Sequence, residues 1–314
     1  MLCSIGAIGG TSKGQEDSED SVKGAQASHT MLTASQVAQY RELGYCVCPQ
    51  FLKLEIEVFL ADIEEICAGA TMVQHDSSRL EMEAKQGLEG RTVRRIYEPC
   101  TYYPHFRTLS ESSHLLDAVE QLLGPNLTFH YSKINMKPPA IGSVVEWHQD
   151  LAYYPLTNRD SLAVLFYLDD ADVHNGCLQI IPGRHLGPAM DHTREEFFQG
   201  RITEPIDESK ALPLEGKAGT AIFMHGMTPH ASAPNSSCLP RRTLILSYRA
   251  ADAFPIYLGE ITVSFEAHLR HVRGVQTGVA RFTSGTFPIP RYPEKTKSLY
   301  ELQELSRKGK QAQA

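Results

Sequence analysis

Six short β-rich runs follow one another between residues 127 and 250, and they constrain the fold of this chain more than any other feature of its sequence. Turn residues separate the runs, which read LTFHYSKINMK, SVVEWHQDLAYY, LAVLFYLDD, GCLQIIPG, GTAIFMHG and RRTLILSYRA. Runs of strand length at such short spacing are typical of antiparallel sandwiches and barrels. The pair Asn175-Gly176 predicts a hairpin turn between two of these strands. We therefore expect a mostly β domain.

Helical patterns flank this β-rich region. The pattern over residues 33–44 predicts a helix that Thr33 or Ser35 caps and Gly44 ends. We expect a strand at 45–49, a helix at 52–70, a polar loop at 76–90, a further helix at 110–123 and a last helix at 293–307. Because no internal repeat or second core is evident, we expect one domain at residues 31–314. Its parts are a helical buttress (31–125), a β-barrel core (126–250) and a C-terminal extension (251–314).

The composition is typical of a soluble globular protein, with 42% hydrophobic and 21% charged residues. A net charge of −7 argues against nucleic acid as a partner, because phosphate binding needs a basic surface. No run approaches the roughly 18 apolar residues that a membrane helix needs. The seven cysteines are scattered without a CxxC pair, which is typical of reduced thiols in an intracellular protein. Residues 1–30 have no signal-peptide pattern, so we expect a disordered tail and a cytoplasmic location.

One pair of residues in the second β-rich run has the chemistry of a metal site. Side chains two residues apart on a strand point to the same face, so His148 and Asp150 can converge on one point. Two histidines and one carboxylate form the open iron(II) site of non-haem oxygenases. This pair alone does not identify a metal site, because the chain has 13 histidines and a surface histidine beside an aspartate is common.

A second set of residues, further along the chain, makes the pattern specific. Residues 219–242 contain, in this order, His230, Ser232, Asn235 and Arg241. Together with His148 and Asp150, this ordered set resembles the phytanoyl-CoA dioxygenase family, iron(II)- and 2-oxoglutarate-dependent oxygenases with a double-stranded β-helix (jelly-roll, cupin-like) fold. Lys137-Pro-Pro and residues 175–185 resemble the family as well, and the resemblance runs from about residue 33 to residue 250.

The resemblance implies a ligand set. His148, Asp150 and His230 would bind iron(II) and act as the catalytic triad, and the guanidinium of Arg241 would hold the distal carboxylate of 2-oxoglutarate. His225 is the rival distal ligand, although its spacing of five residues puts it on the opposite face from His230 if the strand continues.

Further contacts with the cosubstrate are implied around Arg241. Arg241, Thr243 and Ile245 share one strand face, so we expect Arg242 to point outward as a solvated charge. The weaker cosubstrate contacts that the resemblance implies are Lys133, Phe166 and Arg95, for which ordinary packing or a surface charge is the alternative.

The chemistry that the resemblance implies is hydroxylation of a small metabolite. It would consume 2-oxoglutarate and dioxygen, release succinate and carbon dioxide, and use ascorbate as an activator. Halogenases of this superfamily have a small residue in place of the carboxylate, so the intact Asp150 favours hydroxylation, desaturation or ring closure. Two other interpretations stay open: a cupin-like enzyme that uses zinc or manganese, and a catalytically silent binding protein or sensor.

The substrate is less constrained than the metal site. Candidates for lining an aromatic pocket are Tyr102, Tyr103, Tyr153, Tyr154 and Met136, and Arg107 or Arg159 could meet an anionic group. The acidic net charge makes a CoA thioester less attractive. We expect a small-molecule substrate, no nucleic acid and no membrane partner. The C-terminal extension would close the pocket or form a homodimer contact.

Overall fold

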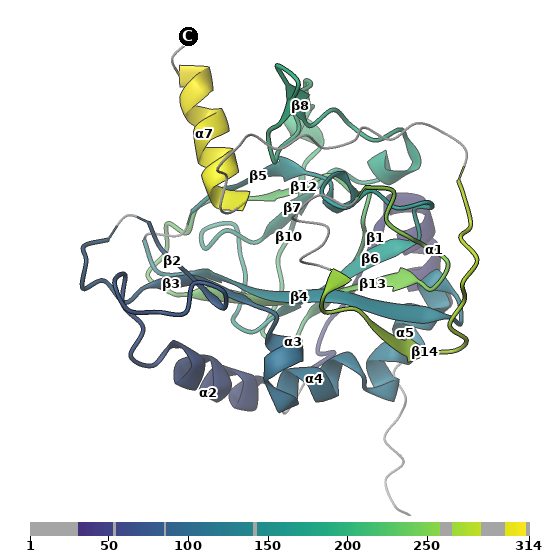
Figure 1. Cartoon of the computed structure of the whole chain (residues 1–314), viewed down its shortest axis with the longest axis horizontal. Coiled ribbons are helices and arrows are strands. Elements are labelled where there is room, and N and C mark those ends of the chain that lie inside the picture. Colours follow the sequence, from purple (N-terminus) through teal and green to yellow (C-terminus); the bar gives the residue numbers. More distant parts are fainter. Residues whose placement is uncertain are drawn as a thin grey trace, which may run out of the picture.

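The computed structural model describes residues 31–52, 55–84, 86–140, 143–257, 266–283 and 299–311. In this part of the chain two antiparallel sheets face each other, and helices cover the outer face of the larger sheet (Figure 1). The tail expected at 1–30 lies outside the described residues, as do the first residues of the helix expected at 293–307. Within the described ranges, no helix is long and apolar enough to cross a membrane.

The larger sheet contains eight strands in the order β1-β11-β6-β13-β4-β3-β2, with β14 also paired to β4. Their bounds are β1 (Tyr45–Cys48), β2 (Leu80–Met82), β3 (Val93–Tyr97), β4 (Leu127–Lys137), β6 (Ser161–Tyr167), β11 (Ala221–His225), β13 (Arg241–Ala250) and β14 (Arg270–Arg273). The smaller sheet has the order β10-β7-β12-β5. Its strands are β5 (Val145–His148), β7 (Leu178–Ile180), β10 (Leu212–Leu214) and β12 (His230–Ser232).

The expected β-barrel is a jelly roll of two separate sheets. Among the described residues no strand pairing joins the larger sheet to the smaller one, so the barrel is not closed by hydrogen bonds. A short two-stranded ribbon, β8 (Thr193–Arg194) with β9 (Phe197–Phe198), lies outside both sheets. The mostly β fold with flanking helices is thus confirmed.

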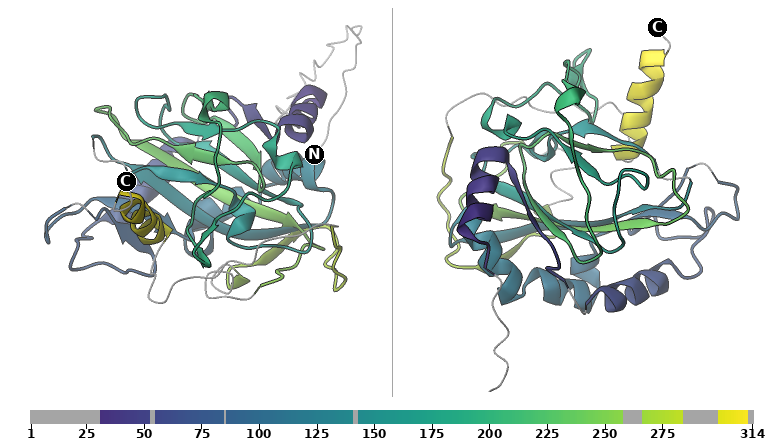
Figure 2. Two further views of the ribbon diagram at one scale, coloured as in Figure 1. Left: turned by 90° about the horizontal axis from the view of Figure 1, so that it is seen from above. Right: turned by 180° about the vertical axis from the view of Figure 1, so that it is seen from behind.

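Helices pack on the larger sheet and near one edge of the smaller one (Figure 2). They are α1 (Ala34–Leu43), α2 (Glu55–Cys67), α3 (Pro99–Tyr102), α4 (Pro104–Ser110), α5 (Ser113–Leu123) and α7 (Leu299–Gln311), with short 3₁₀ turns η1 (Asp150–Ala152), η2 (Arg184–Leu186) and η3 (Glu208–Lys210). Thr33 caps α1 in a capping box and Gly44 ends it, as predicted. The helix predicted at 110–123 is α5, which begins at Ser113 because the side chain of Ser112 accepts a hydrogen bond from the Leu115 N–H and caps it, whereas Ser110 is the last residue of α4. The predicted loop at 76–90 contains β2.

Two apolar layers lie on opposite faces of the larger sheet. On β6, Val164 and Phe166 pack in the layer between this sheet and the helices, whereas Leu165 and Tyr167 pack between the two sheets. This alternation follows from the period of two residues along a strand. It decides which residues of the central strands can reach the interior of the jelly roll.

The Asn175-Gly176 turn connects the two sheets and does not form the predicted hairpin. It follows β6 of the larger sheet and precedes β7 of the smaller sheet, and these strands do not pair with each other. The Asn175 side chain accepts a hydrogen bond from the Asp172 N–H and donates one to the Asp170 carbonyl. The local turn signal was correct, but the strands on either side belong to different sheets.

The C-terminal helix α7 packs beside β5, next to the smaller sheet (Figure 1). Gln303 donates a hydrogen bond to the Gly200 carbonyl at 2.6 Å and accepts one from the Glu146 N–H at 3.4 Å. The Nε of Arg201 donates to the Ser306 hydroxyl at 2.5 Å, and Arg307 lies 3.4 Å from the Glu146 carboxylate. The end of the C-terminal extension therefore supports the strand that carries His148.

We predict that Gly176→Ala destabilises the protein more than Gly69→Ala does. Both glycines have a left-handed backbone, with φ of +77° and +76°, so alanine costs about 1–2 kcal/mol at either position. A Cβ at position 176 would also lie 2.3 Å from the Ala233 carbonyl oxygen, whereas nothing lies within 4 Å of one at position 69. This clash should cost about 1–3 kcal/mol more.

Urea denaturation of the two variants measures this difference in the free energy of unfolding. Equal losses of stability in the two variants would show that a Cβ at position 176 does not clash with the Ala233 carbonyl.

Candidate active site

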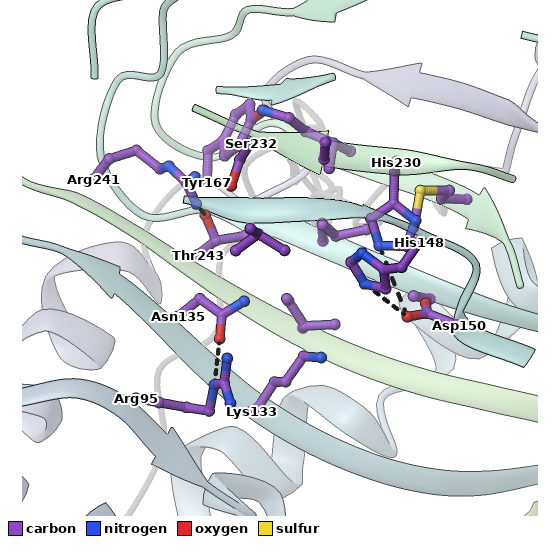
Figure 3. Close-up of a pocket in the computed structure, with 17 residues that line it drawn as sticks. Arg95, Lys133, Asn135, His148, Asp150, Tyr167, His230, Ser232, Arg241 and Thr243 are labelled. Carbon is purple, nitrogen blue, oxygen red and sulfur yellow. Dashed lines mark hydrogen bonds and ion pairs between the residues drawn. The ribbon is translucent and has the colours of Figure 1, made fainter. Parts of the chain in front are cut away.

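Two histidines lie directly opposite each other across a strand pair of the smaller sheet. His148 ends β5, His230 begins β12, and the two residues are register partners. Their ring centroids are 4.0 Å apart. Asp150, at the start of η1, places its Oδ1 3.7 Å from the His148 Nε2 and 3.8 Å from the His230 Nε2 (Figure 3). The three residues predicted as metal ligands are thus brought together.

Backbone carbonyls fix the orientation of both imidazole rings. The Nδ1 of His148 lies 2.8 Å from the Glu146 carbonyl, and the Nδ1 of His230 lies 3.0 Å from the Thr228 carbonyl. A carbonyl only accepts, so in each bond the Nδ1 carries the proton and donates it. The lone pair of each Nε2 therefore faces the Asp150 carboxylate, an arrangement typical of metal-binding histidines.

The surroundings of the two imidazoles favour their neutral form. Burial lowers the pKa of His148 well below its ordinary value, and the neighbouring His230 lowers it further. Burial also lowers the pKa of His230, against the opposing effect of the Asp150 carboxylate. A neutral imidazole is the form that binds a metal ion. Among the described residues, these three form the only cluster of histidine, cysteine or acidic side chains whose donor atoms all lie within 4.8 Å of one another.

Gln149, between the two predicted ligands, holds the end of β5 in place. Its side chain donates to the Met227 carbonyl at 2.6 Å and accepts from the Met190 N–H at 2.7 Å. Its backbone N–H donates to the Nε2 of His192 at 3.0 Å. Sequence analysis missed Gln149 and His192, and strand alternation offered only the hint that Gln149 points away from the metal ligands.

The triad lies at one end of a cavity between the two sheets, called here the central cavity. Seventeen residues line it: Arg95, Lys133, Asn135, Val145, His148, Asp150, Ala163, Leu165, Tyr167, Leu178, Met224, His230, Ala231, Ser232, Arg241, Thr243 and Ile245. As predicted from the strand period, Arg241, Thr243 and Ile245 share the face that lines it. Arg242 points the other way, but it is not a free surface charge, because its Nη2 lies 2.6 Å from the Oδ1 of Asp169.

Arg241 presents an unsatisfied donor in this cavity. Its Nη1 donates to the Thr243 hydroxyl at 2.7 Å, its Nη2 donates to the Gly176 carbonyl, and its buried Nε has no partner. Burial lowers the pKa of Arg241, but an arginine stays protonated in proteins. A buried guanidinium with a free N–H is suited to an anionic group.

Arg95 and Lys133 line the central cavity as well. The Nε of Arg95 donates to Asn135 at 2.9 Å, and its Nη1 lies 3.1 Å from Glu81. Burial by itself would lower the pKa of Arg95, but the Glu81 carboxylate and Tyr97 raise it above its ordinary value. Lys133 is partly buried, and desolvation lowers its pKa to about 8.

Phe166 does not line the central cavity, contrary to the contact that the resemblance implied. It faces the helices, where its ring centroid lies 5.8 Å from that of Phe51. The next residue, Tyr167, lines the cavity instead. The Tyr167 hydroxyl donates to the Leu214 carbonyl at 2.7 Å and accepts from the Leu178 N–H at 3.0 Å. Strand alternation places the two side chains on opposite faces.

The rival ligand His225 lies in a different environment. Its Nδ1 accepts a hydrogen bond from the Met227 N–H, and its ring centroid lies 5.1 Å from that of His185. Burial lowers the pKa of His225 to about 3. Since His225 does not line the central cavity, its position supports the choice of His230.

The aromatic residues considered for the substrate pocket are scattered. Tyr153 packs against the triad, with its ring edge-on to His148 at 5.6 Å between centroids. Tyr154 packs on His130, and Tyr102 is exposed beneath the guanidinium of Arg79. The remaining candidates do not line the central cavity: Tyr103, Met136, Arg107 and Arg159. Met136 lines a small adjoining pocket that shares Arg241 with the central cavity.

Comparison with known proteins agrees with this geometry. Residues 40–243 match the family model of phytanoyl-CoA dioxygenase (PhyH). The chain is 35% identical over 231 residues to the probable alpha-ketoglutarate-dependent hypophosphite dioxygenase of Stutzerimonas stutzeri, covering 71% of this chain and 80% of that protein. It is 27% identical over 223 residues to the methylphosphonate hydroxylase of Gimesia maris, covering 71% and 82%.

A solved structure has the same fold. EctD from S. alaskensis with 2-oxoglutarate and 5-hydroxyectoine superposes with a TM-score of 0.56 at 25% identity, over 70% of this chain and 77% of that chain. The family match covers more than half of the chain, and the sequence relatives agree with it. The chain therefore belongs to the phytanoyl-CoA dioxygenase (PhyH) family of iron(II)- and 2-oxoglutarate-dependent oxygenases.

Proposed function

We propose that this enzyme hydroxylates a small molecule, with His148, Asp150 and His230 as its iron(II) ligands and Arg241 as the residue that holds the distal carboxylate of 2-oxoglutarate. One observation carries the proposal. The two free Nε2 atoms and the Asp150 carboxylate converge at the triad, and the same cavity contains a guanidinium with an unsatisfied N–H. A metal ion and a dicarboxylate would satisfy both.

The donor set fits iron(II). Two imidazoles and one carboxylate leave positions open for a chelating keto acid and dioxygen. Bound iron(II) would activate dioxygen, which is the oxidant: one oxygen atom would enter the substrate and the other would enter succinate as 2-oxoglutarate loses carbon dioxide. The substrate and 2-oxoglutarate would each provide two of the four electrons that dioxygen takes up. The intact Asp150 favours hydroxylation over halogenation.

The side chains of the chain itself bind and orient the reactants. Arg241 would pair with the distal carboxylate, and the Thr243 hydroxyl, 2.7 Å from its Nη1, keeps the guanidinium in place. Arg95, held by Glu81 and Asn135, lines the same cavity and is a further cosubstrate contact in this proposal. No side chain needs to act as a general base.

The substrates named for relatives give the first compounds to test. Hypophosphite, methylphosphonate and ectoine are the substrates in the names of three relatives. Succinate formation that depends on one of these compounds, or on another small metabolite, with an equal amount of oxidised product, would support the proposal. A zinc or manganese enzyme on the same fold, or a silent sensor, would form no succinate.

We predict that His148→Gln and His230→Gln abolish iron binding, whereas His225→Gln retains it. Each of the first two changes removes a nitrogen ligand from a three-residue site, and His225 lies outside that site. Metal analysis after anaerobic loading and desalting measures the iron content per chain. Full occupancy in the His230 variant, or its loss in the His225 variant, would reassign the distal ligand.

We predict that Arg241→Gln weakens 2-oxoglutarate binding by about 100-fold without changing iron content. Losing one partner of a buried, hydrogen-bonded charge pair costs about 2–5 kcal/mol, and about 1.4 kcal/mol corresponds to a factor of ten in affinity.

Arg242→Gln is the matched control for this experiment, because its guanidinium pairs with Asp169 outside the central cavity. Anaerobic titration of the visible charge-transfer band of the iron complex gives the affinity of each variant. An equal effect of the two substitutions would show that another cation holds the cosubstrate.

A further inference from the structure

Lys133 places a second cation in the central cavity, at a distance from Arg241. On the paired strands β4 and β13, Lys133 lies opposite Ile245, whereas Arg241 lies opposite Lys137. Four residues along a strand span roughly 13 Å, at about 3.3 Å per residue. Figure 3 shows the amino group of Lys133 on the side of the triad and Arg241 at the far side of the cavity. The two cations can therefore bind different molecules.

Burial lowers the pKa of Lys133, and the nearby carboxylates of Asp150, Glu98 and Glu81 oppose this only in part. No described residue forms a hydrogen bond or ion pair with the Lys133 amino group, and the closest aromatic contact is the Tyr131 ring, with its centroid 5.4 Å from the Nζ. The neighbouring carboxylates are engaged elsewhere. Glu81 accepts hydrogen bonds from Arg95 and Tyr97, and Glu98 accepts them from the N–H and hydroxyl of Ser132.

The balance of charges with iron(II) and 2-oxoglutarate bound shows that Lys133 has no anionic partner in the cavity. Asp150 and the two carboxylates of 2-oxoglutarate together balance the two charges of iron(II) and that of Arg241. Glu81 balances Arg95, at a distance of 3.1 Å. Of the charged side chains that line the cavity, Lys133 alone then has no ion-pair partner. A charge that is shielded from water is costly unless an anion binds beside it.

We propose that Lys133 binds an anionic group of the substrate, so that this enzyme oxidises a small anion such as a carboxylate, phosphinate or phosphonate. This inference rests on the proposed function, because it requires the cosubstrate to occupy the Arg241 end of the cavity. The position of Lys133 beside the triad then places the anionic group next to the bond that is oxidised. The hydroxylation itself balances as described above, with dioxygen and 2-oxoglutarate as the co-reactants.

The test compares Lys133→Met, which keeps most of the side-chain volume but removes the charge, with Lys133→Arg, which keeps the charge. The iron(II)-loaded protein and 2-oxoglutarate are mixed without oxygen, and the visible charge-transfer band is recorded. Small anions, including methylphosphonate and propionate, are then titrated beside the neutral propionamide. Binding next to the iron perturbs the band, so the readout does not depend on turnover.

The expected result is that anions perturb the band of the unmodified protein and propionamide does not. Lys133→Met should bind 2-oxoglutarate as before but bind the anion about 10- to 100-fold more weakly, because a hydrogen bond to a charged group is worth about 1.5–3 kcal/mol. Lys133→Arg should retain most of the anion affinity.

Three results would overturn the inference. In the first, Lys133→Met loses affinity for 2-oxoglutarate itself, so that Lys133 serves the cosubstrate. In the second, anion affinity is unchanged in Lys133→Met. In the third, no anion perturbs the band of the unmodified protein, or propionamide does so equally. Failure of the proposed function would look different, since the unmodified protein would then bind iron but give no band with 2-oxoglutarate.

Discussion

The pairing of β5 with β12 is the constraint on which the site depends. It places His148 directly opposite His230, with the two rings 4.0 Å apart. Because side chains alternate along a strand, a slip of one residue in this pairing would turn one histidine to the other face of the sheet. The hydrogen bonds of Gln149 to Met227 and Met190 tie the end of β5 to two loops and oppose such a slip.

The larger sheet supplies the other wall of the central cavity and most of its charges. Lys133, Arg95 and Arg241 all come from its strands, whereas the two histidines come from the smaller sheet. The smaller sheet thus carries the two histidines of the triad, and the larger sheet carries the three cations that line the cavity. The turn that contains Gly176 links the two, because its carbonyl accepts a hydrogen bond from Arg241.

Strand periodicity explains why much of the site could be predicted from the sequence. The period of two residues correctly placed Thr243 and Ile245 beside Arg241 on the cavity face. The choice of His230 over His225 came from the family resemblance, because the period indicated only that the two histidines face opposite ways. The same rule shows why the predicted contact of Phe166 with the cosubstrate was wrong, since Tyr167 has the inward position on β6. The expected contact of Phe166 was implied by the family resemblance alone.

What the sequence did not reveal depends on contacts between distant segments. Arg242 forms an ion pair with Asp169, and the backbone N–H of Gln149 donates a hydrogen bond to His192, which lies in a separate loop. The Asn175-Gly176 signal describes four residues, and it carries no information on which sheet each neighbouring strand joins. The support of β5 by α7 likewise joins residues that are far apart in the chain. Local sequence patterns predict where helices and strands lie and which side chains share a face. Contacts between distant segments are seen only in the folded structure.

Crystals grown without oxygen in the presence of iron(II) and 2-oxoglutarate would test the central claim most directly. The account predicts one anomalous peak at the iron edge, bound by the Nε2 atoms of His148 and His230 and by the Asp150 carboxylate. The distal carboxylate of 2-oxoglutarate should lie against Arg241. Iron bound at any other set of side chains, or 2-oxoglutarate bound away from the metal, would contradict it.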